Sequence, residues 1–287
     1  METGRASGWR PYATLLLPPL AWVLLFLILP YGLLFACSFW KLTPAQTIAQ
    51  DWNLQNYLHL FRNAVYLRTL GRSAAIAAAV TLLSLLLAFP VAYWLAFQVK
   101  RHKKLWYMLA IIPLWISYLV RAYAWKTILG TGGVLNAFLV GIGVTDQPIA
   151  MFLYSPVAVI ITLTHIYTPF VLMPVYAMLE QIPPALLEAA EDLGAGPWRT
   201  FTRVVLPLSM PGVVAGCTFA FVLSLGDFLS PLLVGGPTGI MISNIVVSLF
   251  GAAYNWPLGA AISLVMLLLV LAIITLANRL EARTKYV

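Results

Sequence analysis

The side chains in this 287-residue chain that could perform chemistry are few and lie far apart in the sequence. None of its histidines or cysteines is spaced as metal ligands usually are, and they fall in separate segments: His59, His102, His165, Cys37 and Cys217. The chain has no G-x-x-x-x-G-K-[ST] phosphate-binding loop, because its glycine-rich segment 130–133 is not followed by lysine. No serine, histidine and aspartate can be placed at one level of the long apolar segments. The sequence therefore predicts no catalytic residue, no metal site and no cofactor in this chain.

Asp227 is the one acidic residue inside the long apolar run 207–233. If this run crosses a membrane, a charged carboxylate near its centre costs about 2.5–3.5 kcal/mol on insertion scales. We therefore expect Asp227 to face the interior, to pair with a cation, or to be protonated. Two interpretations stay open: Asp227 helps to pass a cationic amine, or it makes a polar contact between helices or with water near the outer interface.

A group of aromatic residues lies near the predicted outer ends of the apolar runs. Their rings could hold an amine by cation–π contact, or they could form the aromatic belt found at membrane interfaces. These residues are Trp115, Tyr118, Tyr123, Trp125 and Tyr167.

The composition places these residues in a membrane protein. Hydrophobic residues make up 62% of the chain and charged residues 9%, against about 25% charged residues in soluble proteins, and the mean hydropathy is +0.91. The net charge of +8 comes from bases that flank apolar runs, as membrane orientation requires, and not from a nucleic-acid-binding surface. We expect an all-α chain surrounded by lipid that binds no nucleic acid.

Six uncharged or nearly uncharged runs are long enough to span a bilayer, which takes about 20 helical residues. The third is interrupted by Arg121 and Lys126, so its length is the least defined. We predict a single transmembrane domain over residues 1–287, with spans at about 12–37, 73–97, 105–127, 151–179, 207–233 and 257–277.

The basic residues predict which way these spans run. One set falls on the side that carries both chain ends: Arg5, Arg10, Lys100, Arg101, Lys103, Lys104, Arg199, Arg203, Arg279, Arg283 and Lys285. The remaining bases are spread over the other side: Lys41, Arg62, Arg68, Arg72, Arg121 and Lys126. The positive-inside rule therefore places both termini in the cytoplasm.

Within the spans, prolines and small residues predict how the helices pack. Pro90, Pro169 and Pro174 are expected to kink their helices, and Gly212 with Gly216 forms a small-xxx-small pair that lets another helix approach closely.

The cytoplasmic segment 180–206 is neither short nor simply basic, and it predicts two short helices. Pro183 and Pro184 suit the start of the first helix, and Gly194 suits a left-handed stop. An apolar stripe lies between them, formed by Leu186, Ala189, Ala190 and Leu193. The acidic residues Glu188, Glu191 and Asp192 adjoin this stripe.

Both features of the first helix point to a protein partner. The apolar stripe needs a covering surface, and an acid in the last turn opposes the helix dipole at a cost of about 0.3–1 kcal/mol. Docking to another protein would explain both. The second helix is predicted to start at Pro197 and to lie on the membrane surface, with Trp198, Phe201 and Val205 on one side.

The same segment resembles a known motif. It contains Glu188, Ala189 and Ala190, then Gly194, and after nine more residues Val204, followed by Leu206 and Pro207. This pattern is similar to the EAA motif of permease subunits of binding-protein-dependent ABC importers. The family usually has isoleucine at the position of Val204. The resemblance implies a type I importer permease fold of six spans with a coupling helix between spans four and five. The residues to which it assigns coupling to the ATPase are Glu188, Ala189, Ala190, Leu193, Gly194, Leu206 and Pro207.

The resemblance extends from about Leu105 to the C-terminus and is closest to spermidine/putrescine-type permeases. The strings that carry it are Trp115–Asn136, Leu186–Gly196, Leu206–Gly216 and Ser224–Gly236. Since other small-solute permeases share parts of these strings, importers of phosphonates or ferric iron remain alternatives.

The resemblance also implies partners and a location. These are an ATPase dimer that binds ATP and Mg, a sister permease, an extracytoplasmic solute-binding protein, and the bacterial inner membrane. The sister permease could be a second copy of this chain or a different chain, and the polyamine-type resemblance favours a different one. Two rivals stay open: a stand-alone secondary transporter, in which 180–206 is only a linker, and an intramembrane enzyme using Asp227 and His165, which lacks a second well-placed carboxylate.

Overall fold

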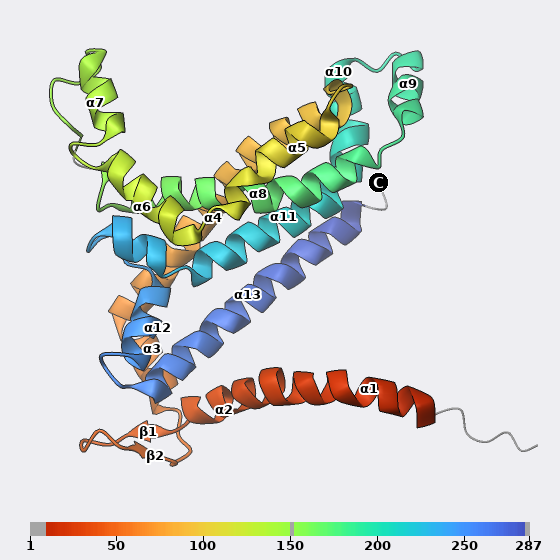
Figure 1. The fold of residues 1–287 in the computed structure, drawn as a ribbon. Helices are drawn as coiled ribbons and strands as arrows, with labels where there is room; N and C mark the ends of the chain where they lie inside the picture. The colour runs from red at the N-terminus through yellow and green to blue at the C-terminus, as the bar shows by residue number, and fades with distance from the viewer. Residues whose placement is uncertain (1–9, 150–151, 285–287) are drawn as a thin grey trace, which may run out of the picture. The chain divides into compact units, whose positions relative to one another are not determined.

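The computed structural model describes residues 10–149 and 152–284, and most of these residues are helical (Figure 1). Arg5, Met151 and Lys285, which figured in the predicted spans and orientation, lie outside the described residues. The α-helices are α1 (Arg10–Val23), α2 (Leu29–Ser38), α3 (Gln55–Arg62), α4 (Ala64–Tyr93), α5 (Lys103–Ile111), α6 (Tyr118–Leu129), α7 (Val134–Gly141), α8 (Pro156–Glu180), α9 (Pro184–Asp192), α10 (Pro197–Thr200), α11 (Leu206–Gly226), α12 (Ile242–Phe250) and α13 (Trp256–Thr284).

Shorter elements extend or connect these helices. Four are π-helical turns and one, η3, is a 3₁₀ turn: η1 (Leu24–Ile28), η2 (Trp94–Gln98), η3 (Ile112–Trp115), η5 (Phe201–Val205) and η6 (Pro231–Gly235). The two strands, β1 (Lys41–Leu42) and β2 (Ile48–Ala49), pair antiparallel, with Lys41 opposite Ala49.

The chain forms two compact units. The first comprises residues 1–63 and 248–267, and the second comprises residues 64–247 and 268–287. The prediction of a single domain over residues 1–287 stays a prediction.

In the first unit, the apolar helix that ends in α2 is fastened to the short helix α3. The Asn56 side-chain amide donates hydrogen bonds of 2.8 Å to the carbonyl oxygens of Ser38 and Trp40. The Ser38 and Tyr57 hydroxyls lie 2.8 Å apart. The two Asn56 bonds satisfy the carbonyl of the last residue of α2 and that of Trp40, two residues beyond it.

In the second unit, α4, α8 and α11 pack against one another (Figure 1). Helix α8 is the most buried of the three, and its buried residues include Val159, Leu163, Ile166, Val171 and Val175. A helix that is apolar on all sides needs a covered environment on all sides, and α8 obtains part of it from α4 and α11.

The predicted small-residue contact is confirmed. A Cβ atom added at Gly212 would lie 2.5 Å from the Pro174 carbonyl oxygen, and one at Gly216 would lie 3.0 Å from the Val171 Cα atom. Both neighbours are backbone atoms of α8. Glycine at these two positions therefore lets the backbones of α11 and α8 meet.

Two of the π-helical turns end just before a proline. The amide of Leu29 bonds to the Leu24 carbonyl, and the amide of Leu206 bonds to the Phe201 carbonyl, each across five residues. The next residues are Pro30 and Pro207, which have no N–H and crowd the preceding turn, so the backbone accommodates them by widening one turn.

The turn η5 joins α10 to α11, and one continuous helix runs over Pro197–Gly226. The second helix of the predicted coupling segment begins at Pro197, as expected. It is not a separate surface helix, however, because the widened turn lets it pass Pro207 and continue into α11.

Among the described residues, five helices are long and apolar enough to cross a membrane: Leu15–Ser38, Ala64–Gln98, Pro156–Glu180, Pro197–Gly226 and Trp256–Arg279. A sixth span arises if the bent pair Lys103–Trp115 and Tyr118–Gly141, which meet at 86°, is counted as one.

Several helix bounds differ from the predicted spans. The second helix starts at Ala64 rather than near residue 73. The helix expected over 105–127 breaks at Ile116 and Ser117, whose ψ angles of 134° and 136° are extended. The helix expected over 207–233 ends at Gly226. Helices α4 and α8 continue through Pro90, Pro169 and Pro174 without a break, and the kinks predicted there stay predictions.

The glycine contact yields the first testable prediction. Gly212→Ala places a methyl group against the backbone of α8, so we expect it to destabilise the protein by about 1–3 kcal/mol, the usual cost of overpacking. Gly71→Ala is the matched control, because a Cβ atom there meets nothing within 4 Å. Thermal unfolding of the purified variants in detergent measures the difference. Equal midpoints for the two variants would contradict the close approach.

Candidate functional site

The first candidate region is helix α9, which both of its predicted end signals delimit. Pro183 is extended, with ψ at 132°, and Pro184 opens the helix. At the other end, Gly194 has φ at +77°, its amide bonds to the Glu191 carbonyl, and the Ala195 amide bonds to the Ala190 carbonyl. This pair of bonds is the Schellman motif that a left-handed glycine allows. The predicted stop at Gly194 is confirmed.

One edge of α9 is apolar and exposed, with no described segment of the chain covering it. Leu193 is 88% exposed and Leu186 is 43% exposed, and Ala189 between them is also exposed. Leu187, which the predicted stripe did not include, packs against the core of the second unit, and Ala190 is half-buried. One side of α9 therefore packs on the second unit, and another side exposes Leu186, Ala189 and Leu193 to solvent.

The acidic residues of α9 face solvent as well, and the rest of the motif lies in the next helix. Glu188, Glu191 and Asp192 are exposed. Leu206 and Pro207 open α11, directly after η5, and η5 contacts α9. The structure thus brings the end of the motif near its beginning through the turn that Pro207 causes.

The second candidate region is centred on Asp227, which is 7% exposed. Asp227 does not lie within a helix, as the predicted span 207–233 implied, but at the break after α11. Its Oδ1 atom accepts hydrogen bonds from the Leu229 and Ser230 amides, at 2.9 and 3.2 Å. These are the bonds of a helix N-cap, and they explain why the chain ends one helix and starts another here.

Two tyrosines complete the surroundings of this carboxylate. Its Oδ2 atom accepts hydrogen bonds from the Tyr118 hydroxyl and, at 2.9 Å, from the Tyr167 hydroxyl. The Tyr118 hydroxyl also lies 2.6 Å from the Ser230 hydroxyl. In the described part of the chain, no lysine or arginine forms an ion pair with Asp227. Neutral donors alone hold the carboxylate.

An open hollow of about 390 Å³ adjoins this cluster. Tyr118, Tyr167 and Asp227 line it together with apolar residues from the end of α11, among them Val222 and Leu223. The hollow is large enough for an extended small molecule and combines two aromatic rings with one carboxylate.

The remaining predicted aromatic residues do not join this cluster. Trp115 is 79% exposed and Tyr123 is also exposed. Trp125 packs on His165, with ring centroids 5.4 Å apart. Of the five aromatic residues predicted as cation contacts, the structure places only Tyr118 and Tyr167 beside Asp227.

Sequence reasoning missed several participants. Ser243 donates a 2.5 Å hydrogen bond to the Asp227 carbonyl oxygen, and Ser230 contacts Tyr118. Neither serine carries a distinctive signal in the sequence. Arg121 is 8% exposed and donates to the Ile166 carbonyl at 3.3 Å. Its charge within an apolar run was a visible signal, since buried arginines in such runs are rare.

Comparisons with known proteins agree with the geometry. Residues 88–286 match the family described as "Binding-protein-dependent transport system inner membrane component". The chain is 34% identical over 266 residues to the spermidine/putrescine transport system permease protein PotB of Haemophilus influenzae, with 92% of each chain covered. It is 39% identical to the inner membrane ABC transporter permease protein YdcU of Escherichia coli, covering 93% of this chain and 89% of that protein.

A solved structure shares the fold. It is a bacterial alginate ABC transporter in complex with an alginate pentasaccharide-bound periplasmic protein, and one of its chains superposes with a TM-score of 0.74 at 26% identity. The match covers 96% of this chain and 94% of that chain.

Proposed function

The chain belongs to the family of inner membrane components of binding-protein-dependent transport systems and is a permease subunit of an ABC importer; within that importer, we propose, it forms half of the solute pathway and couples to a separate ATPase. Family membership argues against a stand-alone secondary transporter and against an intramembrane enzyme. The observation that carries the coupling role is the uncovered apolar edge of α9, formed by Leu186, Ala189 and Leu193.

In this proposal, ATP and Mg bind to the ATPase dimer and not to this chain. Helix α9 seats its apolar edge on the ATPase, with Glu188, Ala190 and Gly194 shaping the contact. Both termini and α9 face the cytoplasm, as the distribution of basic residues predicts. A different sister permease supplies the other half of the pathway, and an extracytoplasmic solute-binding protein delivers the solute.

The proposed mechanism joins these partners in one cycle. The loaded binding protein docks on the outer loops, and ATP binding closes the ATPase dimer. The closure displaces α9, and α8 and α11 move with it because α9 follows directly after α8 and contacts η5, which leads into α11. The pathway then opens outward, the solute enters, and hydrolysis restores the first state.

We propose a polyamine or a related small organic amine as the solute. The names of the related permeases support this class, and so does the hollow at Asp227. A carboxylate with which no described lysine or arginine pairs, together with two adjacent rings, attracts a cationic amine through charge and cation–π contact. An anionic solute would meet repulsion from Asp227 at the same place.

Purification of the tagged chain from its native membrane tests the function as a whole. We expect an ATPase with a phosphate-binding loop and a second permease to remain bound in gentle detergent and to be identified by mass spectrometry. The reconstituted complex with its binding protein should take up radiolabelled spermidine or putrescine only with ATP. A chain that purifies alone and transports without ATP would overturn the proposal.

A substitution at Gly194 tests the coupling role. Gly194→Val forces a β-branched residue to a φ of +77°, at a cost of about 1–2 kcal/mol, so solute transported per ATP hydrolysed should fall about tenfold. Gly196→Ala is the matched control, because Gly196 has φ at −71° and a Cβ atom there meets nothing within 4 Å. Glu188→Ala should also lower the ratio. Normal coupling in both Gly194→Val and Glu188→Ala would refute the assignment.

The substitution Asp227→Asn tests the cation role. Asparagine is as good an N-cap as aspartate, so the fold and the assembled complex should persist. Loss of the negative charge should weaken uptake of a cationic solute about tenfold, the factor that one charge-assisted contact of about 1.5 kcal/mol contributes. Concentration-dependent uptake in proteoliposomes measures this, with Tyr123→Phe as the control at an exposed ring outside the cluster. Unchanged uptake kinetics in Asp227→Asn would leave Asp227 with a capping role only.

A further inference from the structure

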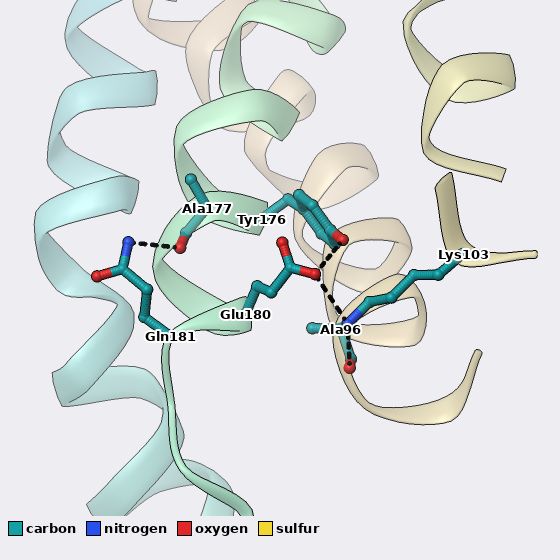
Figure 2. Close-up of polar contacts among 6 residues, drawn as sticks. All are labelled: Ala96, Lys103, Tyr176, Ala177, Glu180 and Gln181. Atoms are coloured by element: carbon teal, nitrogen blue, oxygen red, sulfur yellow. Dashed lines mark hydrogen bonds and ion pairs between the residues drawn. The ribbon is translucent and has the colours of Figure 1, made fainter. Parts of the chain in front are cut away.

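A polar cluster at the base of α9 joins the ends of three helices (Figure 2). The Lys103 ammonium lies 3.2 Å from the Glu180 carboxylate and donates a 3.1 Å hydrogen bond to the Ala96 carbonyl oxygen. The same Glu180 oxygen accepts a 2.8 Å hydrogen bond from the Tyr176 hydroxyl. Lys103 opens α5, Ala96 lies in the turn η2 that ends α4, and Tyr176 and Glu180 lie in the last turn of α8.

Ring contacts reinforce the cluster. The Tyr176 ring stacks on the Tyr107 ring of α5, with centroids 4.7 Å apart and planes 26° apart. The Lys103 ammonium lies 5.7 Å from the centroid of the Tyr176 ring. The end of α8 is therefore bound to α5 both by charge and by stacking.

The connection between this cluster and α9 is short. Glu180 is the last residue of α8, and α9 begins at Pro184. In the connection, the Gln181 and Ile182 amides bond back to carbonyls of α8, at 3.2 Å each, and Ile182 is buried. Pro183 adds a fixed φ angle. A force on α9 is thus passed directly to the end of α8.

The ion pair of this cluster is partly exposed to solvent. The Lys103 side chain is 29% exposed and the Glu180 side chain is 48% exposed. An ion pair with this much solvent exposure stabilises a fold only slightly, because solvent screens the charges. What the pair provides is a contact between the start of α5 and the end of α8.

We propose that Lys103, Tyr176 and Glu180 form a clamp that passes the displacement of α9 from α8 to α4 and α5 during transport. The three are positioning residues for the coupled reaction and touch neither solute nor nucleotide. The inference rests on the proposed function, since it requires an ATPase to displace α9. It adds a route by which that displacement reaches helices that α9 itself does not continue into.

The test uses the complete importer in proteoliposomes and measures both solute uptake and ATP hydrolysis. Lys103→Met and Glu180→Gln each remove one charge of the clamp. We expect solute transported per ATP to fall about two- to fivefold in each variant, the range that a partly exposed ion pair supports. ATP hydrolysis itself should change less than uptake, because the ATPase contact on α9 is intact.

Three further variants separate a clamp from a general effect of charge. Lys104→Met removes the neighbouring charge of the same helix turn, where the side chain is exposed, and should leave the ratio unchanged. Lys103→Arg keeps the charge and should retain most of the coupling. The exchange Lys103→Glu with Glu180→Lys should couple better than either Lys103→Met or Glu180→Gln.

The outcomes that overturn the clamp are distinct from those that overturn the function. A wild-type complex with ATP-dependent uptake, together with a normal ratio in Lys103→Met and Glu180→Gln, refutes the clamp alone. An equal loss in Lys104→Met also refutes it. If the Glu180→Gln complex does not assemble, the two Lys103 variants decide. Equal amounts of solute transported per ATP in Lys103→Met and Lys103→Arg then refute the clamp. A wild-type complex that transports without ATP overturns the clamp and the function together.

Discussion

The close backbone approach of α8 and α11 is the constraint on which the arrangement of both candidate regions depends. Without a side chain at Gly212 and Gly216, the backbone of α11 rests on Pro174 and Val171 of α8. In a lipid environment, such packing replaces the hydrophobic force that holds helices together in water. At these two positions the backbones of α8 and α11 therefore pack directly on one another.

The two candidate regions lie at opposite ends of this pair. Asp227, directly after α11, is held by Tyr167 in the middle of α8, and α8 leads at its C-terminal end through Glu180 toward α9. Tyr167 and Glu180 are separated by about 20 Å along the helix at 1.5 Å per residue. Two packed helices therefore connect the two regions, and the proposed coupling uses this connection.

The ends of α9 and the glycine contact could be predicted from the sequence because each rests on local chemistry. Proline opens a helix, a left-handed glycine closes it, and paired small residues admit a neighbour, whatever the rest of the chain does. The break at Asp227 was missed because hydropathy counts apolar residues and takes no account of a side chain that caps the next helix. The continuous helix through Pro207 was missed because one widened turn can accommodate a proline.

The partners within both clusters could not be predicted. Tyr118 and Tyr167 reach Asp227 from positions 109 and 60 residues away in the chain, and Lys103 reaches Glu180 from another helix. Such pairings depend on the register of packed helices, which no local pattern encodes. Composition and spacing named Asp227 and the two tyrosines as candidates, but only the packing of α6, α8 and α11 shows that they meet.

Because η5 is a widened helical turn, the number of residues between Gly194 and Pro207 determines the direction in which α9 and α10 extend from α11. One residue more or less in a helical turn rotates everything beyond it by about 100°. Deleting a residue from Val204–Val205 would restore a regular helix and rotate α10 together with Phe201, the first residue of η5, whose ring now packs against Phe89 and Tyr93. Substitutions in this stretch are a matter of side-chain fit, whereas insertions and deletions change the direction in which the whole of α9 is presented.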